Sequence, residues 1–138
     1  MKSKTIYVTA NDAKRLQAQL EVAKRSQYYG SDDLKKLGAE LNRATIVAST
    51  EIHPDVITMN SKVRLLDLGT KEEMTYTLVF PDEVEVSEGK ISVFAPIGTA
   101  MLGFRVGDTI NWKVPAGVRR IKVLAILYQP EASGDFHL

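Results

Sequence analysis

The sequence predicts an α+β protein in which a short antiparallel helical hairpin precedes an antiparallel β-sheet domain with one short helix. Apolar residues recur at steps of three and four before residue 50, the period of a helix, and alternate with polar residues after it, the period of a strand. Dense turn residues then divide the last third of the chain into short segments, as an antiparallel sheet requires. We therefore predict a hairpin over 1–52 and a sheet domain over 53–138.

A capping signal and two apolar stripes predict the helical hairpin. Thr9 precedes Asp12 by three residues, the spacing of a capping box with Asp in place of Glu or Gln, so a helix is expected to begin there. A break at residues 27–31 separates the two helices. Because each stripe is narrow, we expect the helices to pair through a coiled-coil seam. The stripes are Ala13, Leu16, Leu20 and Ala23, then Leu34, Leu37, Leu41, Ala44 and Ala48.

Period-two alternation and turn residues predict the elements of the sheet domain. Residues 62–67 and 75–80 alternate as strands, and 69–73 form the loop between them. Residues 91–128 then have the order strand, turn, short helix, turn and two strands. Pro96 and Gly98 bracket the first of these turns, and the apolar run at 99–104 predicts the short helix.

The composition excludes several classes of protein. The chain has 138 residues with 18 Lys and Arg against 17 Asp and Glu, so its formal net charge is only +1. No global field draws it to nucleic acid or to an anionic membrane, and we expect no direct sequence-specific nucleic-acid binding. The absence of Cys excludes disulfides and thiolate metal sites. Without an apolar leader or a run of about 18 apolar residues, we expect a cytoplasmic protein with no membrane contact.

The sequence contains no complete motif of a known catalytic site. Gly98 and Gly103 have the spacing of a phosphate loop, but Phe104 and Arg105 stand where Lys and Ser or Thr are needed. His53 and His137 are isolated and lack the spacing of zinc ligands. A Ser-His-Asp triad assembles in space and therefore stays open, but no nucleophile elbow occurs. We therefore predict a protein that is not an enzyme and has no catalytic residues, metal or cofactor.

Short motifs between residues 95 and 118 carry a family resemblance. They are Ala95-Pro96-Ile97-Gly98, Ala100-Met101-Leu102-Gly103, Val106-Gly107-Asp108 and Pro115-Ala116-Gly117-Val118. This layout resembles the C-terminal domain of bacterial Gre-type transcription elongation factors, which is like the FK506-binding proteins in fold. The run 55–68, the lone Trp112 and the ending 128–138 are more similar still to the family called regulator of nucleoside diphosphate kinase, a short-armed Gre relative.

The resemblance directs attention to the tip of the hairpin. In Gre factors, acidic residues at the arm tip hold a catalytic magnesium ion in the polymerase, and Asp32 and Asp33 lie at this tip. The alternative is that they cap the second helix. The predicted arm is only about 25 Å long, too short for Gre-type transcript cleavage, which we do not expect here. Tyr28 and Tyr29 would either contact a partner or cover the end of the hairpin.

The resemblance also implies a polymerase-binding loop. In Gre factors, the loop that corresponds to Ala95, Pro96, Ile97 and Gly98, with Met101 beside it, docks on the coiled-coil rim at the mouth of the secondary channel. The alternative is a structural turn followed by a helix that fills the core.

Two functions follow as hypotheses. The resemblance implies a non-enzymatic regulator that binds RNA polymerase at the secondary-channel rim and competes with Gre-type factors, and we expect a monomer. Its effect on nucleoside diphosphate kinase would then be indirect, through transcription, although direct contact with the kinase stays open. The alternative is a peptide-binding domain of the peptidyl-prolyl isomerase type, which needs an aromatic-lined pocket. The candidates for that lining are Tyr76, Phe94, Phe104, Trp112 and Tyr128.

Overall fold

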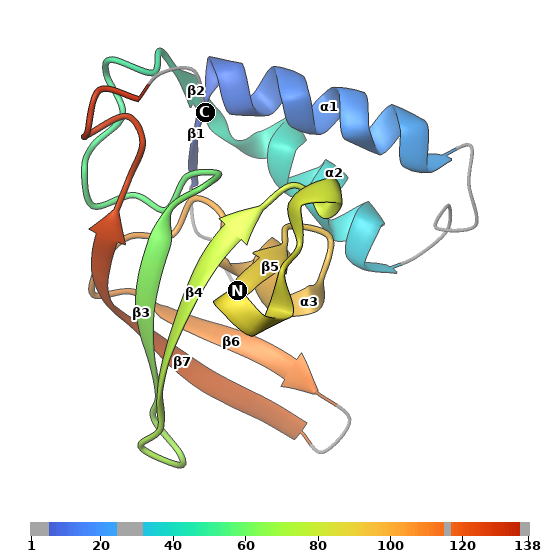
Figure 1. Ribbon diagram of the computed structural model, residues 1–138. Coiled ribbons are helices and arrows are strands. Elements are labelled where there is room, and N and C mark those ends of the chain that lie inside the picture. The colour runs from blue at the N-terminus through green and yellow to red at the C-terminus, as the bar shows by residue number, and fades with distance from the viewer. Residues whose placement is uncertain (1–5, 25–31, 115–116, 136–138) are drawn as a thin grey trace.

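The computed structural model describes residues 6–24, 32–114 and 117–135, and it places two antiparallel helices beside a twisted sheet (Figure 1). Strand β1 (Tyr7–Thr9) leads into α1 (Ala10–Lys24), and α2 (Asp32–Arg43) returns into β2 (Thr45–Val47). β1 and β2 pair in parallel. The expected pair of helices is therefore present. No helix among the described residues is long and apolar enough to cross a membrane.

The second helix is shorter than its apolar stripe predicts. We expected the stripe to continue to Ala48, but α2 ends at Arg43 and residues 45–47 form β2. Thr45, Ile46 and Val47 are all β-branched, which disfavours a helix and favours a strand. Pairing with β1 then supplies their backbone with partners.

Five strands form the main sheet in the order β5-β4-β3-β7-β6. Three of its neighbouring pairs are antiparallel, as predicted, but β4 and β5 are parallel, so the prediction of a purely antiparallel sheet is wrong there. The reason is the connection, because two 3₁₀ turns carry the chain back before β5 begins. The strands are β3 (Lys62–Asp67), β4 (Glu73–Val79), β5 (Lys90–Ser92), β6 (Thr109–Val114) and β7 (Gly117–Tyr128), and the turns are η1 (Pro81–Glu83) and η2 (Val86–Glu88).

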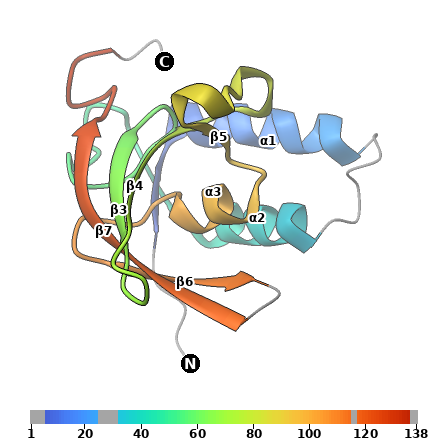
Figure 2. The ribbon, with the colours of Figure 1, turned by 60° about the horizontal axis from the view of Figure 1, so that its bottom comes forward.

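A single hydrophobic cluster joins the helices to the sheet. The short helix α3 (Pro96–Met101) lies on the same side of the sheet as α1 and α2 (Figure 2). The apolar stripes of α1 and α2 pack on strand and α3 residues as well as on each other, so the seam is wider than that of a two-stranded coiled coil. Members of this cluster include Leu16, Leu20, Leu37, Leu41, Leu65, Leu78, Phe80, Met101, Ile110 and Ile121.

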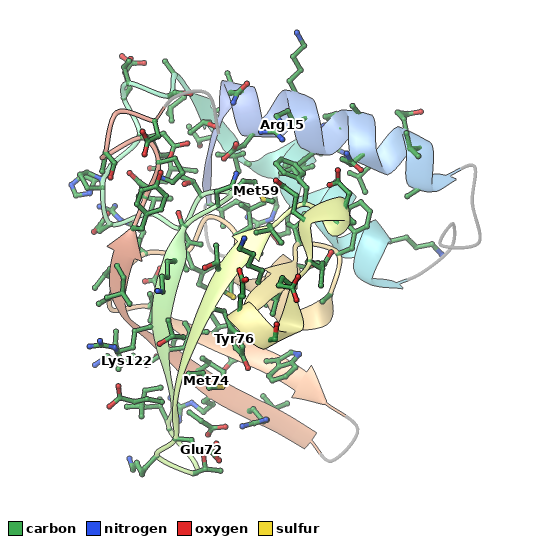
Figure 3. The ribbon with its side chains drawn as sticks, in the orientation of Figure 1. Arg15, Met59, Glu72, Met74, Tyr76 and Lys122 are labelled. Carbon is green, nitrogen blue, oxygen red and sulfur yellow. The ribbon has the colours of Figure 1, made fainter. Side chains whose placement is uncertain are left out.

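Polar contacts of α1 reinforce this attachment. The Asp12 backbone N–H donates to Thr9 Oγ1 over 3.0 Å, which confirms the predicted helix start. The Asp12 carboxyl group is buried, and its Oδ2 accepts a hydrogen bond from the Met59 backbone N–H over 3.1 Å. One turn later, the Arg15 guanidinium lies 4.1 Å from the centre of the Phe80 ring (Figure 3). Asp12 therefore connects α1 to a loop 47 residues away, which its spacing from Thr9 did not indicate.

Candidate functional site

The turn that leads from β5 into α3, which we call the α3 turn (residues 92–99), is fixed by its backbone. Ala95 is extended, with φ −71° and ψ 151°, and Pro96 is the first residue of the helix. Proline suits that position because its φ is already helical and no N–H needs a partner there. The Ala95 N–H donates to Ser92 O over 3.0 Å, and the Thr99 N–H donates to Ala95 O over 2.9 Å. The helix thus begins three residues earlier than the predicted start at Thr99.

Close packing holds the α3 turn against the end of β5. The Thr99 hydroxyl donates to Val93 O over 2.7 Å, and Ser92 Oγ accepts from the Phe94 N–H over 2.9 Å. A Cβ atom at Gly98 would lie 2.0 Å from Ser92 O, far inside contact distance. Only glycine fits at this position without a shift of the backbone.

The residues of the predicted polymerase-binding loop differ in what they expose. Ala95 and Ile97 are half-buried, and Ile97 packs partly against the core. Gly98 is buried against β5. The Met101 side chain is fully buried, so in this conformation it supports the turn from the core and offers no surface to a partner. Binding by the turn itself stays a prediction.

The hairpin tip is described only in part. Asp32 and Asp33 are the first two residues of α2, and their side chains lie outside what the structure describes, so both interpretations stay predictions. Tyr28 and Tyr29 lie outside the described residues. Within the described ranges, no group of three or more His, Asp or Glu side chains is placed to hold a metal ion.

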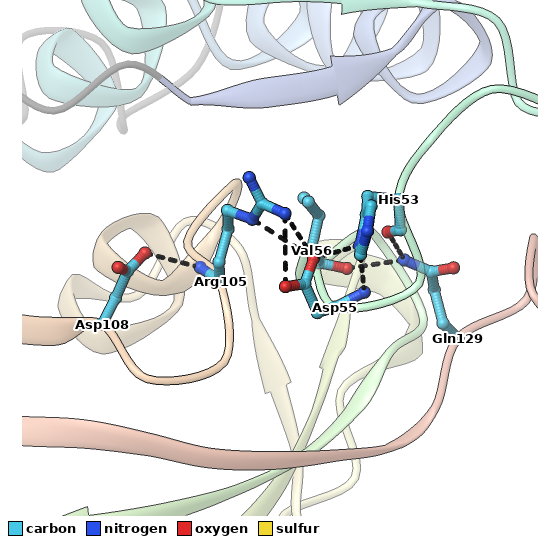
Figure 4. A network of polar contacts seen from close by, with 6 residues as sticks. All are labelled: His53, Asp55, Val56, Arg105, Asp108 and Gln129. Atoms are coloured by element: carbon cyan, nitrogen blue, oxygen red, sulfur yellow. Dashed lines mark hydrogen bonds and ion pairs between the residues drawn. The ribbon is translucent and has the colours of Figure 1, made fainter.

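A polar network beside the sheet was missed by the sequence analysis (Figure 4). The Arg105 guanidinium donates to both oxygens of Asp55 over 3.2 and 3.3 Å, and His53 Nδ1 lies 2.5 Å from Asp55 Oδ1. Gln129 Nε2 donates to His53 O and Val56 O over 2.9 and 2.7 Å. The network therefore joins the loop before β3, the loop before β6 and the segment after β7.

One part of this network has a local signal in the sequence. Asp108 follows Arg105 by three residues, and its carboxylate accepts from the Arg105 N–H over 2.8 Å. This is a short side-chain-to-backbone turn of the kind that Asp favours. The contacts to Asp55 and Gln129 span 50 or more residues and have no comparable signal.

The aromatic residues considered for a peptide pocket serve the fold. Tyr76, Phe94, Phe104 and Trp112 pack against the hydrophobic cluster. The Tyr128 hydroxyl donates to Asp135, and this hydrogen bond raises the pKa of Tyr128 to about 12. Their positions give the isomerase alternative no support.

Comparisons with known proteins agree along the whole chain. The family described as transcription elongation factor GreA/GreB, C-terminal, matches residues 42–128, and the family described as Rnk N-terminus matches residues 4–47. The regulator of nucleoside diphosphate kinase from Escherichia coli strain K12 is 42% identical over 139 residues, covering all of both chains. Transcription elongation factor GreA from Pelobacter propionicus is 34% identical over 112 residues, covering 81% of this chain and 71% of that protein.

A solved structure shares the fold as well. The prokaryotic transcription elongation factor GreA/GreB from Nitrosomonas europaea superposes with a TM-score of 0.75 at 39% identity. The match covers 91% of this chain and all of that one. Most of the fold therefore also occurs in a protein of similar sequence.

Proposed function

Because the chain belongs to the regulator of nucleoside diphosphate kinase family, whose C-terminal part is shared with GreA/GreB, we propose that it is a non-catalytic transcription regulator that binds RNA polymerase. The observation that carries this proposal is the full-length match to the Escherichia coli regulator, together with the match of residues 42–128 to the elongation-factor domain. The site of binding would be the rim of the secondary channel, and the mode of action would be competition with Gre-type factors.

The short helices support competition without transcript cleavage. α1 has 15 residues and α2 has 12, which corresponds to about 22 and 18 Å at 1.5 Å per residue. The chain also spans only 71% of the GreA protein that it matches. A protein that shares the docking domain but has a short hairpin would occupy the rim without bringing a metal-binding tip into the active centre. In this proposal residues 53–138, with an FK506-binding-protein-like fold, carry the affinity, and residues 1–52 obstruct the channel.

The rigidity of the α3 turn supports its role as the contact. Its hydrogen bonds and the close approach of Gly98 to β5 fix the turn before any partner arrives. A preformed turn loses little conformational entropy on binding. Ile97 is the largest aliphatic side chain that the turn leaves half-exposed. A monomer in the cytoplasm would suffice for this function, and any effect on nucleoside diphosphate kinase levels would then be indirect.

Binding to core RNA polymerase, with and without a Gre factor as competitor, tests the proposal. We expect mutually exclusive binding. Ile97→Asp should weaken binding at least about tenfold, the loss typical of a buried apolar contact. Val118→Asp is the matched control, because Val118 is 58% exposed on β7, outside both the turn and residues 1–52. Simultaneous binding of both factors would contradict competition, and full affinity of a folded Ile97→Asp protein would exclude the turn as the interface.

A further inference from the structure

The outer face of the main sheet, which points away from the helices, carries exposed cations. Along β3, Val63 and Leu65 are buried while Lys62 and Arg64 are exposed. Along β7, Ile121 and Val123 are buried while Arg120 and Lys122 are exposed. Because successive side chains of a strand point to opposite faces, all four cations share the outer face. Figure 3 shows Lys122 on this side, whereas Tyr76 lies on the side of α3.

The strand register places the four cations in one line. Leu66 of β3 pairs with Lys122 of β7, so Lys122 lies one step beyond Arg64 along the direction of β3. Arg120 lies one step further, because its carbonyl accepts from the Leu68 N–H over 2.9 Å. Each step of two residues is about 7 Å, so the line is about 20 Å long. We call Lys62, Arg64, Lys122 and Arg120 the cationic stripe.

Hydrogen-bonding side chains flank the cationic stripe on both neighbouring strands. On β4, Thr77 pairs with Lys62 and Thr75 pairs with Arg64. On β6, Thr109 pairs with Lys122 and Asn111 pairs with Arg120. Every cation therefore has a hydroxyl or amide neighbour on the same face.

The side chains of the cationic stripe have few partners within the protein. In the described parts of the chain, no hydrogen bond or ion pair engages the side chains of Lys62, Arg120 and Lys122, and Arg64 reaches Glu73 only at 3.8 Å between exposed side chains. Several other cations are committed to partners within the fold. Arg43, Arg105 and Arg119 contact carboxylates, Lys90 contacts Glu88, and Arg15 lies over the Phe80 ring.

We propose that the cationic stripe binds the phosphate backbone of a single-stranded nucleic acid. A line of cations matches an extended polyanion better than it matches a compact acidic surface, and Thr and Asn side chains commonly join Arg and Lys in phosphate contacts. The centres of protein interfaces are instead enriched in aromatic residues, Met and Arg and depleted of Lys, and two of the four stripe cations are Lys. Tyr128 is the aromatic residue paired with the stripe, opposite Lys62, and its hydroxyl is held by Asp135. Base stacking is therefore minor, and the binding is independent of sequence.

Anisotropy of a labelled oligouridine of about 20 nucleotides, measured between about 50 and 200 mM salt, tests this proposal. We expect binding that weakens steeply with salt, with a logarithmic slope of about −0.7 for each phosphate neutralised. The double variant Arg120→Gln/Lys122→Gln should lose about tenfold or more in affinity at low salt and reduce the slope by about 1.4. The matched control Lys14→Gln/Lys35→Gln removes the same charge from exposed positions on α1 and α2 and should change affinity less than about threefold.

Three outcomes would overturn the proposal. The first is the absence of oligouridine binding by the folded wild-type protein at low salt. The second is an equal loss of oligouridine affinity in the stripe variant and in the helix control, which would show that only the net charge of the protein matters. The third is tighter binding of oligoglutamate or of a duplex of equal length, which would make the partner an acidic polypeptide or a double strand. Polymerase is absent from this assay, and Ile97→Asp should leave oligouridine binding intact, so the outcome is independent of the function proposed above.

Discussion

The two sides of the main sheet differ in what their side chains contact. On the inner side, in the helices that cover the sheet, Gly98, Thr99 and Asp12 meet fixed partners at close distances, and their neighbours are buried. On the outer face, Lys62 and Lys122 stand exposed with no partner among the described residues. Substitutions on the inner side should therefore change stability first, whereas substitutions on the outer side should change binding and leave stability nearly unaltered.

The largest effect is expected at Gly98, on the inner side. Gly98→Ala should lower the free energy of unfolding by about 4 kcal/mol or more, because the new Cβ would meet backbone atoms of Ser92 that cannot move aside. Urea denaturation measures this loss. Gly38→Ala is the matched control, since a Cβ at Gly38 in α2 meets nothing within 4 Å, and it should stabilise by about 0.5–1 kcal/mol. Equal small effects of the two substitutions would show that the α3 turn can relax.

The next effect depends on pH and concerns Asp12. Burial raises the pKa of Asp12 to about 7, against the partly offsetting hydrogen bond from Met59. A raised pKa means that the folded state holds a proton that the unfolded state has already released, so stability is lost as pH rises from about 4 through about 7. Asp12→Asn cannot ionise and keeps an acceptor for the Met59 N–H. The variant should match wild type near pH 4 and exceed it near pH 8 by about 4 kcal/mol.

Urea denaturation of both proteins at several pH values checks this difference. If wild type is less stable than Asp12→Asn only at high pH, the result agrees with a buried carboxyl group that is neutral at low pH. A variant that is less stable than wild type at pH 8 would show that the folded state prefers the charged carboxylate, contrary to expectation.

A smaller effect compares one threonine on each face. Thr99→Val removes the hydroxyl that donates to Val93 O over 2.7 Å and should cost about 1–2 kcal/mol. Thr75→Val lies on the outer face of β4, where Thr75 is exposed, and should change stability by less than about 0.5 kcal/mol. Thermal unfolding of the two variants gives the comparison, and equal losses would remove the distinction between the faces.

The smallest stability effect is expected for the cationic stripe. Arg120→Gln/Lys122→Gln should leave the unfolding free energy within about 0.5 kcal/mol of wild type, because both side chains are exposed and no described partner holds them. Chemical denaturation measures this value alongside the oligouridine assay. A loss well above that limit would mean that the outer face stabilises the fold and would confound its use as a binding surface.

Local signals in the sequence located most elements but not all of their ends. The capping Thr9 and the apolar period placed the start of α1 correctly, because a helix start depends on neighbours a few residues apart. Alternation placed β3 and β4. The α3 turn was recognised from Pro96 and Gly98, although the helix begins at Pro96 itself. The errors lie at β2, which depends on pairing with β1, and at β5, whose direction depends on the turns before it.

The sequence by itself determined the α+β class and the family, because periodicity, turn residues and short motifs are local properties of the chain. Tertiary structure alone decided what individual side chains do. It buried Asp12 against Met59, turned Met101 into the core and joined Asp55 to Arg105. It also aligned Lys62 and Arg64 with Lys122 and Arg120, which lie more than 50 residues away. Such contacts depend on strand register and on packing between distant segments, and no short stretch of sequence encodes them.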